Sequence, residues 1–241
     1  MKFEELENLN EGIEDKGILK AIYFAGLPGA GKTTIAGRIT DGQVAPRTVN
    51  TDKSFEFLSK KAGMVPSSVA WALVGPSAKV MNNEMLFQYL NSMLPLYVDG
   101  TSANPGAALR RVGLTESLGY DTMMIWVNID VEEAIDRAKQ RERKVDPDYI
   151  RKVHDAVAAN KPFYAQRFGK NFVEVDNTGR NFDSAAGKVG NIADNFFLSP
   201  VNNPIGVKLI QHMRETGDKY LIPNHASEEY LKKIVSVWYM K

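Results

Sequence analysis

The sequence contains no cysteine, only three histidines and almost no net charge. The lack of cysteine excludes disulfide frameworks, cysteine-ligated zinc, iron–sulfur sites and a cysteine nucleophile. His154, His212 and His225 lie far apart in the chain, which argues against a histidine metal cluster. A net charge of +1 excludes a chain-wide polycation that coats nucleic acid. No segment approaches the roughly 18 apolar residues of a membrane span. We therefore expect a soluble protein of a reducing compartment, the cytoplasm.

Short apolar segments alternate with helical patterns along most of the 241 residues. Such alternation predicts an α/β fold in which helices cover both faces of a parallel sheet. We expect strands over residues 18–25, 48–50, 96–98, 122–129 and 171–175. We expect helices over 33–39, 54–62, 77–94, 105–118, 131–143, 148–168 and 182–197.

The pattern divides the chain into three parts. Residues 1–17 form an acidic lead-in, and residues 18–198 carry the alternating pattern of a single domain. A break rich in Pro and Asn (SPVNNP) then introduces residues 199–241, which we read as a helical extension.

A glycine-rich loop between the first strand and the first helix carries the clearest chemical signal. Residues 26–33 (GLPGAGKT) fit the pattern G-x-x-x-x-G-K-[ST]. In such a loop backbone N–H groups cradle phosphate oxygens, the lysine reaches the β- and γ-phosphates, and the hydroxyl ligates Mg²⁺. The residues that we expect to bind the nucleotide here are Gly26, Pro28, Gly29, Ala30, Gly31, Lys32, Thr33 and Thr34.

Four later segments follow the predicted strands: 49–52 (VNTD), 96–101 (LYVDGT), 137–150 (RAKQRERKVDPDYI) and 175–179 (VDNTG). Together with the loop, they make residues 18–178 similar to the P-loop small-molecule and polynucleotide kinases, which include phage polynucleotide kinases and zeta-toxin-like kinases. The resemblance implies a kinase-type P-loop NTPase with three layers and a five-stranded parallel sheet. It also implies ATP and Mg²⁺ as cofactors, an alcohol-group acceptor and, for a viral source, the host cytoplasm as location.

The resemblance assigns Asp52 as the general base that takes the proton from the acceptor hydroxyl. An alternative is that Asp52 only caps the following helix. Polynucleotide kinases tend to carry an arginine shortly after this aspartate, whereas here Lys53 is the only nearby cation.

Further residues receive roles from the same resemblance. Asp99 would act on Mg²⁺ or position the acceptor, together with Thr101, and Arg110 or Arg111 would bind an acceptor phosphate. Residues 137–150 would form a lid, whose Arg137, Arg141 and Arg143 are candidates to stabilise charge on the transferring group. Solvated helix faces are the alternative for these arginines. Asn177 is a candidate adenine contact, or part of an Asx turn.

The acceptor is less well defined than the donor. Residues 137–170 carry a net charge of +6 (ten cations and four anions) with aromatic residues between them, which favours a nucleic-acid acceptor: a 5′-hydroxyl end or a hydroxymethyl base of DNA. Three alternatives stay open. They are a zeta-toxin-like kinase of a nucleotide-activated amino sugar, a small nucleoside or metabolite kinase, and a non-catalytic ATP-binding switch.

Overall fold

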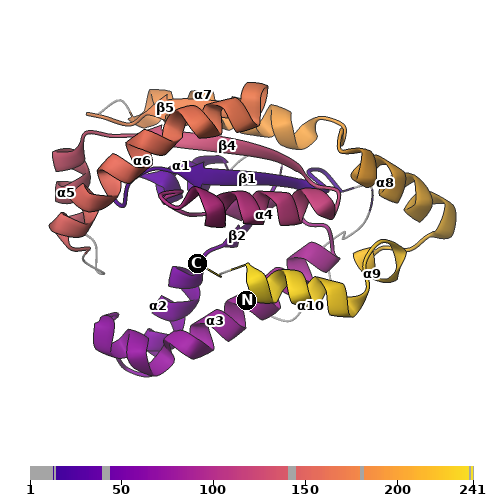
Figure 1. The fold of residues 1–241 in the computed structure, drawn as a ribbon, viewed down its shortest axis with the longest axis horizontal. Helices are drawn as coiled ribbons and strands as arrows, with labels where there is room; N and C mark the ends of the chain where they lie inside the picture. Colours follow the sequence, from indigo (N-terminus) through magenta and orange to yellow (C-terminus); the bar gives the residue numbers. More distant parts are fainter. Residues whose placement is uncertain are drawn as a thin grey trace.

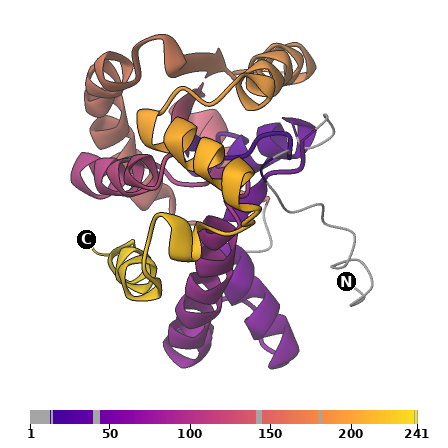
Figure 2. The same cartoon turned by 90° about the vertical axis from the view of Figure 1, so that its right-hand side faces the viewer.

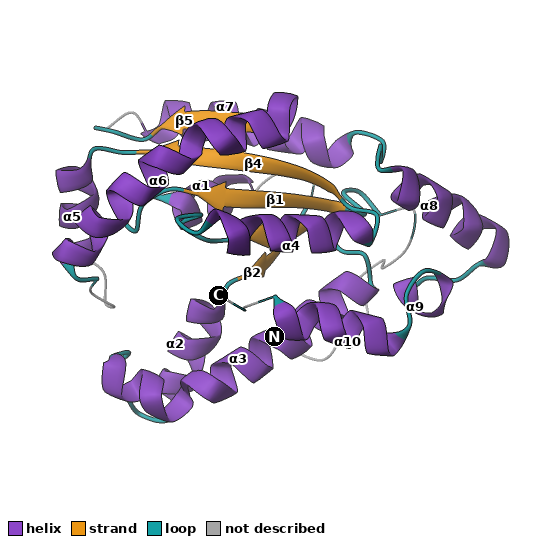
Figure 3. Cartoon of the chain, in the orientation of Figure 1, coloured by secondary structure: helices purple, strands orange, loops and turns teal. Residues whose placement is uncertain are grey.

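The computed structural model of the chain describes residues 13, 15–39, 44–140, 145–179, 182–238 and 240. It contains a sheet of five parallel strands in the order β2-β3-β1-β4-β5 (Figures 1 and 3). The strands are β1 (Lys20–Ala25), β2 (Arg47–Val49), β3 (Leu96–Val98), β4 (Asp121–Asn128) and β5 (Phe172–Asp176). The predicted α/β fold with a five-stranded parallel sheet is confirmed, and each predicted strand is present with ends shifted by at most two residues.

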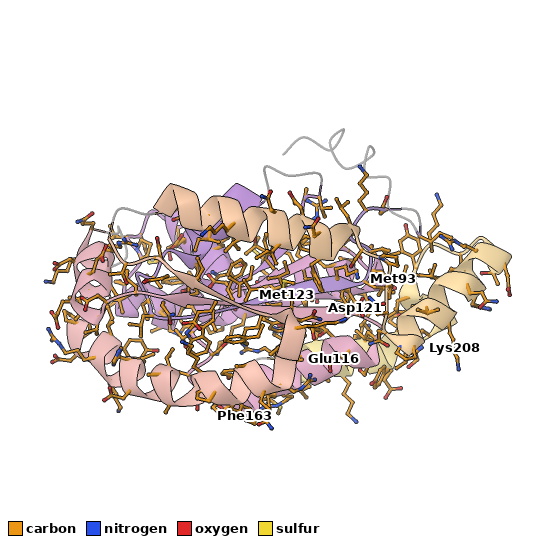
Figure 4. The ribbon with its side chains drawn as sticks, turned by 90° about the horizontal axis from the view of Figure 1, so that it is seen from above. Met93, Glu116, Asp121, Met123, Phe163 and Lys208 are labelled. Carbon is orange, nitrogen blue, oxygen red and sulfur yellow. The ribbon has the colours of Figure 1, made fainter. Side chains whose placement is uncertain are left out.

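Helices cover both faces of the sheet, so the central strands β1 and β4 are almost entirely buried. On one face α1 (Lys32–Ile39) packs with α7 (Phe182–Leu198). On the other face lie α4 (Pro105–Ser117) and α6 (Pro147–Phe168), and Figure 4 shows the sheet between these two layers. This burial explains why β1 and β4 read as nearly continuous apolar segments. A short 3-10 turn, η2 (Gly169–Asn171), leads into β5.

Helices α2 (Thr51–Lys61) and α3 (Ser68–Asn91) project from the body as a pair (Figure 2). The helix that we expected over residues 77–94 starts nine residues earlier, at Ser68, so Pro76 lies inside it. A proline inside a helix removes one backbone hydrogen bond, so Pro76 destabilises the helix locally. Packing against α2 outweighs that cost: the rings of Phe55 and Trp71 meet edge to face at 4.9 Å.

Helix α5 (Val131–Lys139) follows β4 and contacts α6. It ends earlier than the expected residue 143, and residues 141–144 lie outside the described part of the chain. The C-terminal extension is helical, as expected, and consists of α8 (Pro204–Thr216), α9 (Leu221–Asn224) and α10 (Glu228–Val237). Helix α10 packs on α3. Among the described residues, no helix has both the length and the hydrophobicity that crossing a membrane requires.

Candidate active site

The glycine loop joins the end of β1 to the start of α1, as the sequence predicted. Gly29 and Gly31 adopt φ of +90° and +86°, a region that other L-residues rarely occupy. The surrounding atoms also leave no room for a side chain at either glycine. A Cβ on Gly29 would collide with the carbonyl oxygen of Ala134, and a Cβ on Gly31 would collide with the side-chain nitrogen of Asn177. Glycine is therefore required at both positions by backbone conformation and by close packing.

Lys32 lies across this loop. Its Nζ donates hydrogen bonds to the carbonyl oxygens of Gly26 (2.9 Å) and Leu27 (2.8 Å), and the residue is only 8% exposed. Thr33 and Thr34 follow on the first turn of α1 and are exposed. The loop thus presents the amino end of a helix, a lysine and a hydroxyl side by side, which is the arrangement that binds phosphate.

Asn177 and Arg137 support the loop from behind. Asn177 is buried, and its Nδ2 donates to the carbonyl oxygen of Ala30 at 2.7 Å. Arg137 donates to the carbonyl oxygens of Asn177 and Gly179, both at 3.0 Å, and pairs with Glu133 at 2.5 Å. The Asn177 amide nitrogen therefore binds the phosphate loop, and the predicted adenine contact of this residue stays a prediction.

Arg137 is also placed for a direct role. Its Nη1 lies 3.9 Å from the point where a Cβ on Gly31 would stand, so its guanidinium lies next to the phosphate loop. This agrees with the predicted electrostatic role, which stays a prediction. Arg141 and Arg143, the other lid candidates, lie outside the described residues.

A cleft of about 780 Å³ opens in front of the loop. It is lined by residues from the loop and α1, from the first turns of α2, from the segment after β3 and from the start of α6. The charged residues among them are Lys32, Asp52, Lys53, Glu56, Asp99 and Asp146. Residues from four separate elements thus converge at the carboxyl ends of the parallel strands, where open α/β sheets bind their ligands.

Asp52 lies in the first turn of α2 and is exposed to this cleft. The N-cap of α2 is Asn50, whose side-chain oxygen accepts a hydrogen bond from the Asp52 backbone N–H at 2.8 Å. The capping role that offered an alternative for Asp52 is therefore performed by Asn50.

Asp99 follows β3 and faces the same region. Its Oδ2 accepts a hydrogen bond from Asn50 Nδ2 at 2.9 Å, whereas its Oδ1 is buried without a hydrogen-bond partner among the described residues. Thr101 connects this segment to the phosphate loop, because its carbonyl oxygen accepts from the Gly26 N–H at 3.3 Å.

The residues around the loop also fit a magnesium ion. Thr33 and Asp99 line the same cleft, and a carboxylate and a hydroxyl supply hard oxygen ligands of the kind that Mg²⁺ takes beside substrate phosphates. Within the described part of the chain, no group of three or more His, Cys, Asp or Glu residues could hold a metal by itself.

Helix α6 fastens the segment after β3. Tyr164 donates its hydroxyl to the carbonyl oxygen of Ser102 (3.0 Å), and Asn160 donates to that of Ala103 (3.0 Å). Burial raises the pKa of Tyr164 to about 12, so its phenol stays protonated as a donor at neutral pH. Ser102 has φ of +57°, and these bonds hold that unusual backbone next to Asp99.

Arg110 and Arg111, the predicted contacts for an acceptor phosphate, reach the far end of the chain. Arg111 Nε donates to the carbonyl oxygen of Trp238 at 2.8 Å, and Arg110 Nη1 donates to that of Met240 at 3.1 Å. Arg111 also lines a smaller cavity beside Asp52 and Asp99. No local pattern predicts the contribution of Trp238, which lies 127 positions after Arg111.

Five of the ten cations in the basic stretch 137–170 form ion pairs, and three others, Arg141, Arg143 and Lys144, lie outside the described residues. Ion pairs join Arg137 to Glu133, Lys139 to Asp136, Arg151 to Glu132, Lys161 to Glu174, and Arg167 to Glu116. Tyr164 and Phe168 are buried in the core. Tyr149 and Phe163 are 51% and 45% exposed, so charge pairing and burial account for only part of the pattern that favoured nucleic acid.

This fold and loop are those of the P-loop kinases. A family model described as an AAA domain matches residues 22–161, more than half of the chain, and the chain belongs to that family. A search of the curated proteins found no match.

Solved structures give the same fold. A Chloroflexus aurantiacus protein, named only provisionally as a kinase, is 14% identical, with 74% of this chain and 98% of that chain covered and a TM-score of 0.52. Shikimate kinase from Acinetobacter baumannii, in complex with shikimate, is 22% identical, with 73% and 94% covered and a TM-score of 0.45. Deoxyadenosine kinase from M. mycoides, with bound dATP, is 15% identical, with 72% and 99% covered and a TM-score of 0.45. At such identities the likeness concerns the fold.

Proposed function

We propose that this protein is an ATP-dependent kinase that transfers the γ-phosphoryl group of ATP to a hydroxyl of a small molecule. The observation that carries the proposal is the cleft in front of the phosphate loop. Its volume of about 780 Å³ lies within the range of small-molecule sites. An exposed carboxylate, Asp52, lines this cleft together with Lys32 and Thr33, which are suited to the donor phosphates.

The charges of the cleft favour a small acceptor over a polynucleotide. Its described lining carries four carboxylates against two ammonium groups, and one of those, Lys32, belongs to the phosphate loop. A polynucleotide backbone is recognised by cations, and carboxylates repel it. Arg110 and Arg111 each donate a hydrogen bond to a carbonyl group of the C-terminal segment, and neither lines this cleft. We therefore place the small-molecule acceptor ahead of the nucleic-acid acceptor.

The transfer assigns one task to each group. Asp52 accepts the proton of the acceptor hydroxyl, whose oxygen forms a bond to the γ-phosphorus as the bond from that phosphorus to the β–γ bridging oxygen breaks, so ADP leaves. Lys32 and the loop N–H groups stabilise the phosphate charge, and Arg137 adds a cation beside the loop. Thr33 and Asp99 are the residues that would hold Mg²⁺, which supplies further charge neutralisation when bound.

The test is transfer of labelled γ-phosphate from ATP to pools of small hydroxylated molecules, compared with 5′-hydroxyl DNA and RNA and hydroxymethyluracil DNA. We expect label on a small molecule and none when Lys32 is replaced by Ala. Asp52→Asn should lower kcat by about 10²–10⁴-fold, the usual contribution of a general base. Glu56→Gln is the matched control, since Glu56 lines the same cleft one turn further along α2.

Each outcome has a definite meaning. Label on a polymer would restore the nucleic-acid acceptor. Release of free phosphate alone would favour the ATP-binding switch. Transfer by Asp52→Asn at a rate near that of the wild type, with the fold intact, would show that Asp52 is not the base.

A further inference from the structure

A second cavity, of about 200 Å³, lies beside the cleft and shares Asp52 and Asp99 with it. Its walls come from the ends of β2 and β3, the start of α2, helix α4 and the end of the chain. The lining residues are Val49, Asn50, Thr51, Asp52, Val98, Asp99, Arg111 and Trp238. The cavity therefore adjoins the predicted base and includes one residue, Trp238, from outside the family match at 22–161.

Three polar atoms of this lining have no hydrogen-bond partner among the described residues, although each is buried. They are the Thr51 hydroxyl, Asp99 Oδ1 and the indole nitrogen of Trp238. Buried polar groups are nearly always paired in folded proteins. This one cavity therefore contains a hydroxyl, an acceptor and a donor that all lack a hydrogen-bond partner. Their combination indicates that a polar molecule binds there.

Trp238 is held firmly at this position. It is 1% exposed, its carbonyl oxygen accepts from Arg111 Nε, and the next described carbonyl, that of Met240, accepts from Arg110. Helix α10 ahead of it packs on α3, and Trp238 lines the same cavity as Thr51 and Asp52. The tryptophan is therefore a fixed part of the cavity wall.

We propose that the C-terminal segment forms one wall of the acceptor subsite, with Trp238 as a specificity-determining residue, and that the acceptor is a neutral polyhydroxylated molecule such as a sugar or a cyclic polyol. The proposal rests on the proposed kinase function. The class follows from the chemistry of the walls. The lining carries two carboxylates, Asp52 and Asp99, and one guanidinium, Arg111, so charges of both signs are present and a ligand of either charge meets a like charge. The unpartnered acceptor, donor and hydroxyl match several hydroxyl groups of one uncharged ligand. The cavity holds roughly six or seven water volumes, the size of a monosaccharide.

The experiment measures transfer from ATP to three panels of similar size: neutral monosaccharides and cyclic polyols, hydroxy acids, and nucleosides. We expect transfer to a member of the first panel. Trp238→Phe keeps the aromatic shape but removes the N–H donor, so it should raise the acceptor KM by about tenfold, as the loss of one hydrogen bond does. The KM for ATP should not change.

Two further variants make this result specific. Thr51→Val removes the hydroxyl on the opposite wall and should also raise the acceptor KM without changing that for ATP. Trp71→Phe is the matched control. Trp71 lies on α3 against Phe55 and does not line the cavity, so this variant should change neither KM.

The outcomes separate this proposal from the kinase function. Transfer only to hydroxy acids or nucleosides, or an acceptor KM that neither Trp238→Phe nor Thr51→Val changes, would overturn the subsite while the kinase function stands. If nothing accepts phosphate, the kinase function fails. In that case the melting temperature of the protein, measured with and without each neutral compound, tests whether the subsite exists. A rise in melting temperature that Trp238→Phe abolishes supports it, and no rise, as for a cavity that holds only water, overturns it.

Discussion

Lys20 opens the central strand β1 and is 1% exposed, which is unusual for a lysine. Its Nζ donates to Asp121 Oδ2 (2.7 Å), Ser199 Oγ (3.1 Å) and the carbonyl oxygen of Pro200 (2.9 Å), so all three ammonium protons are used. Asp121, labelled in Figure 4, opens β4 and also accepts from the backbone N–H groups of Asn202 and Asn203. The pair therefore joins the sheet to the beginning of the C-terminal extension.

Replacing Lys20 by Met keeps the length of the side chain and removes the charge. Asp121 is 12% exposed and would keep only two backbone donors, without a counter-charge. Removing one partner of a buried ion pair costs about 3–5 kcal/mol. For a chain of this size that corresponds to a fall in melting temperature of roughly 6–20 °C. Urea unfolding followed by circular dichroism gives the free energy, and thermal unfolding gives the shift.

Lys139→Met is the matched control. Lys139 pairs with Asp136 at 3.0 Å, but the two side chains are 57% and 68% exposed, and an exposed pair of this kind contributes about 0–1 kcal/mol. The double variant with Asp121→Asn should recover part of the loss, because the uncompensated charge is gone. If Lys20→Met costs no more than Lys139→Met, the buried pair does not stabilise the fold as argued.

Three further predictions concern the loop, its surroundings and the cofactor. Gly29→Ala would drive a Cβ into the Ala134 carbonyl oxygen, so ATP affinity measured by calorimetry should fall at least about tenfold; Gly113→Ala, which meets no atom within 4 Å in α4, should leave it unchanged. The side-chain hydrogen bond from Thr178 lowers the pKa of Asp176, so Thr178→Val should raise that pKa in an NMR titration. Because the folded-state pKa is depressed, the stability contributed by Asp176 is present above its unfolded pKa and is lost as pH falls through the folded value. Removal of Mg²⁺ with EDTA should lower transfer by roughly a hundredfold or more, and added Mg²⁺ should restore it.

The parts of the molecule that were predicted from the sequence depend on local patterns. Strand β4 is a long apolar run because it is buried on both faces, and the phosphate loop is recognisable because its glycines meet a steric demand within a few residues. The start of α3 was predicted wrongly because Pro76 interrupts the local pattern. Its helical conformation depends on contacts with α2, which are encoded in another segment.

The residues of the site also divide into those that a local pattern reveals and those that depend on contacts with a distant segment. Asp52 and Asp99 could be predicted to lie in one cleft because each stands within three residues of the end of a strand, and the carboxyl ends of parallel strands lie on the same side of the sheet. The partners of Arg110 and Arg111 could not be found in this way, since a bond to a backbone carbonyl 127 or 130 positions later leaves no trace in the residue types. Three ion pairs of the stretch 137–170 likewise join separate elements, and net charge along the sequence does not reveal them.

The C-terminal extension connects the two ends of the sheet. Its first residues are bound to Lys20 and Asp121, where β1 and β4 begin, and its last helix ends at Trp238, beside Asp99, where β3 ends. Because the strands are parallel, the first attachment lies at the amino ends of the strands and the second at their carboxyl ends. Weakening the first attachment should therefore loosen the wall that we assign to the acceptor subsite. Lys20→Met, assayed well below its melting temperature, should raise the acceptor KM more than the KM for ATP, since the side chains that support the phosphate loop, Asn177 and Arg137, both precede the extension. Equal changes in both constants would mean that the extension supports the domain as a whole and not the acceptor wall in particular.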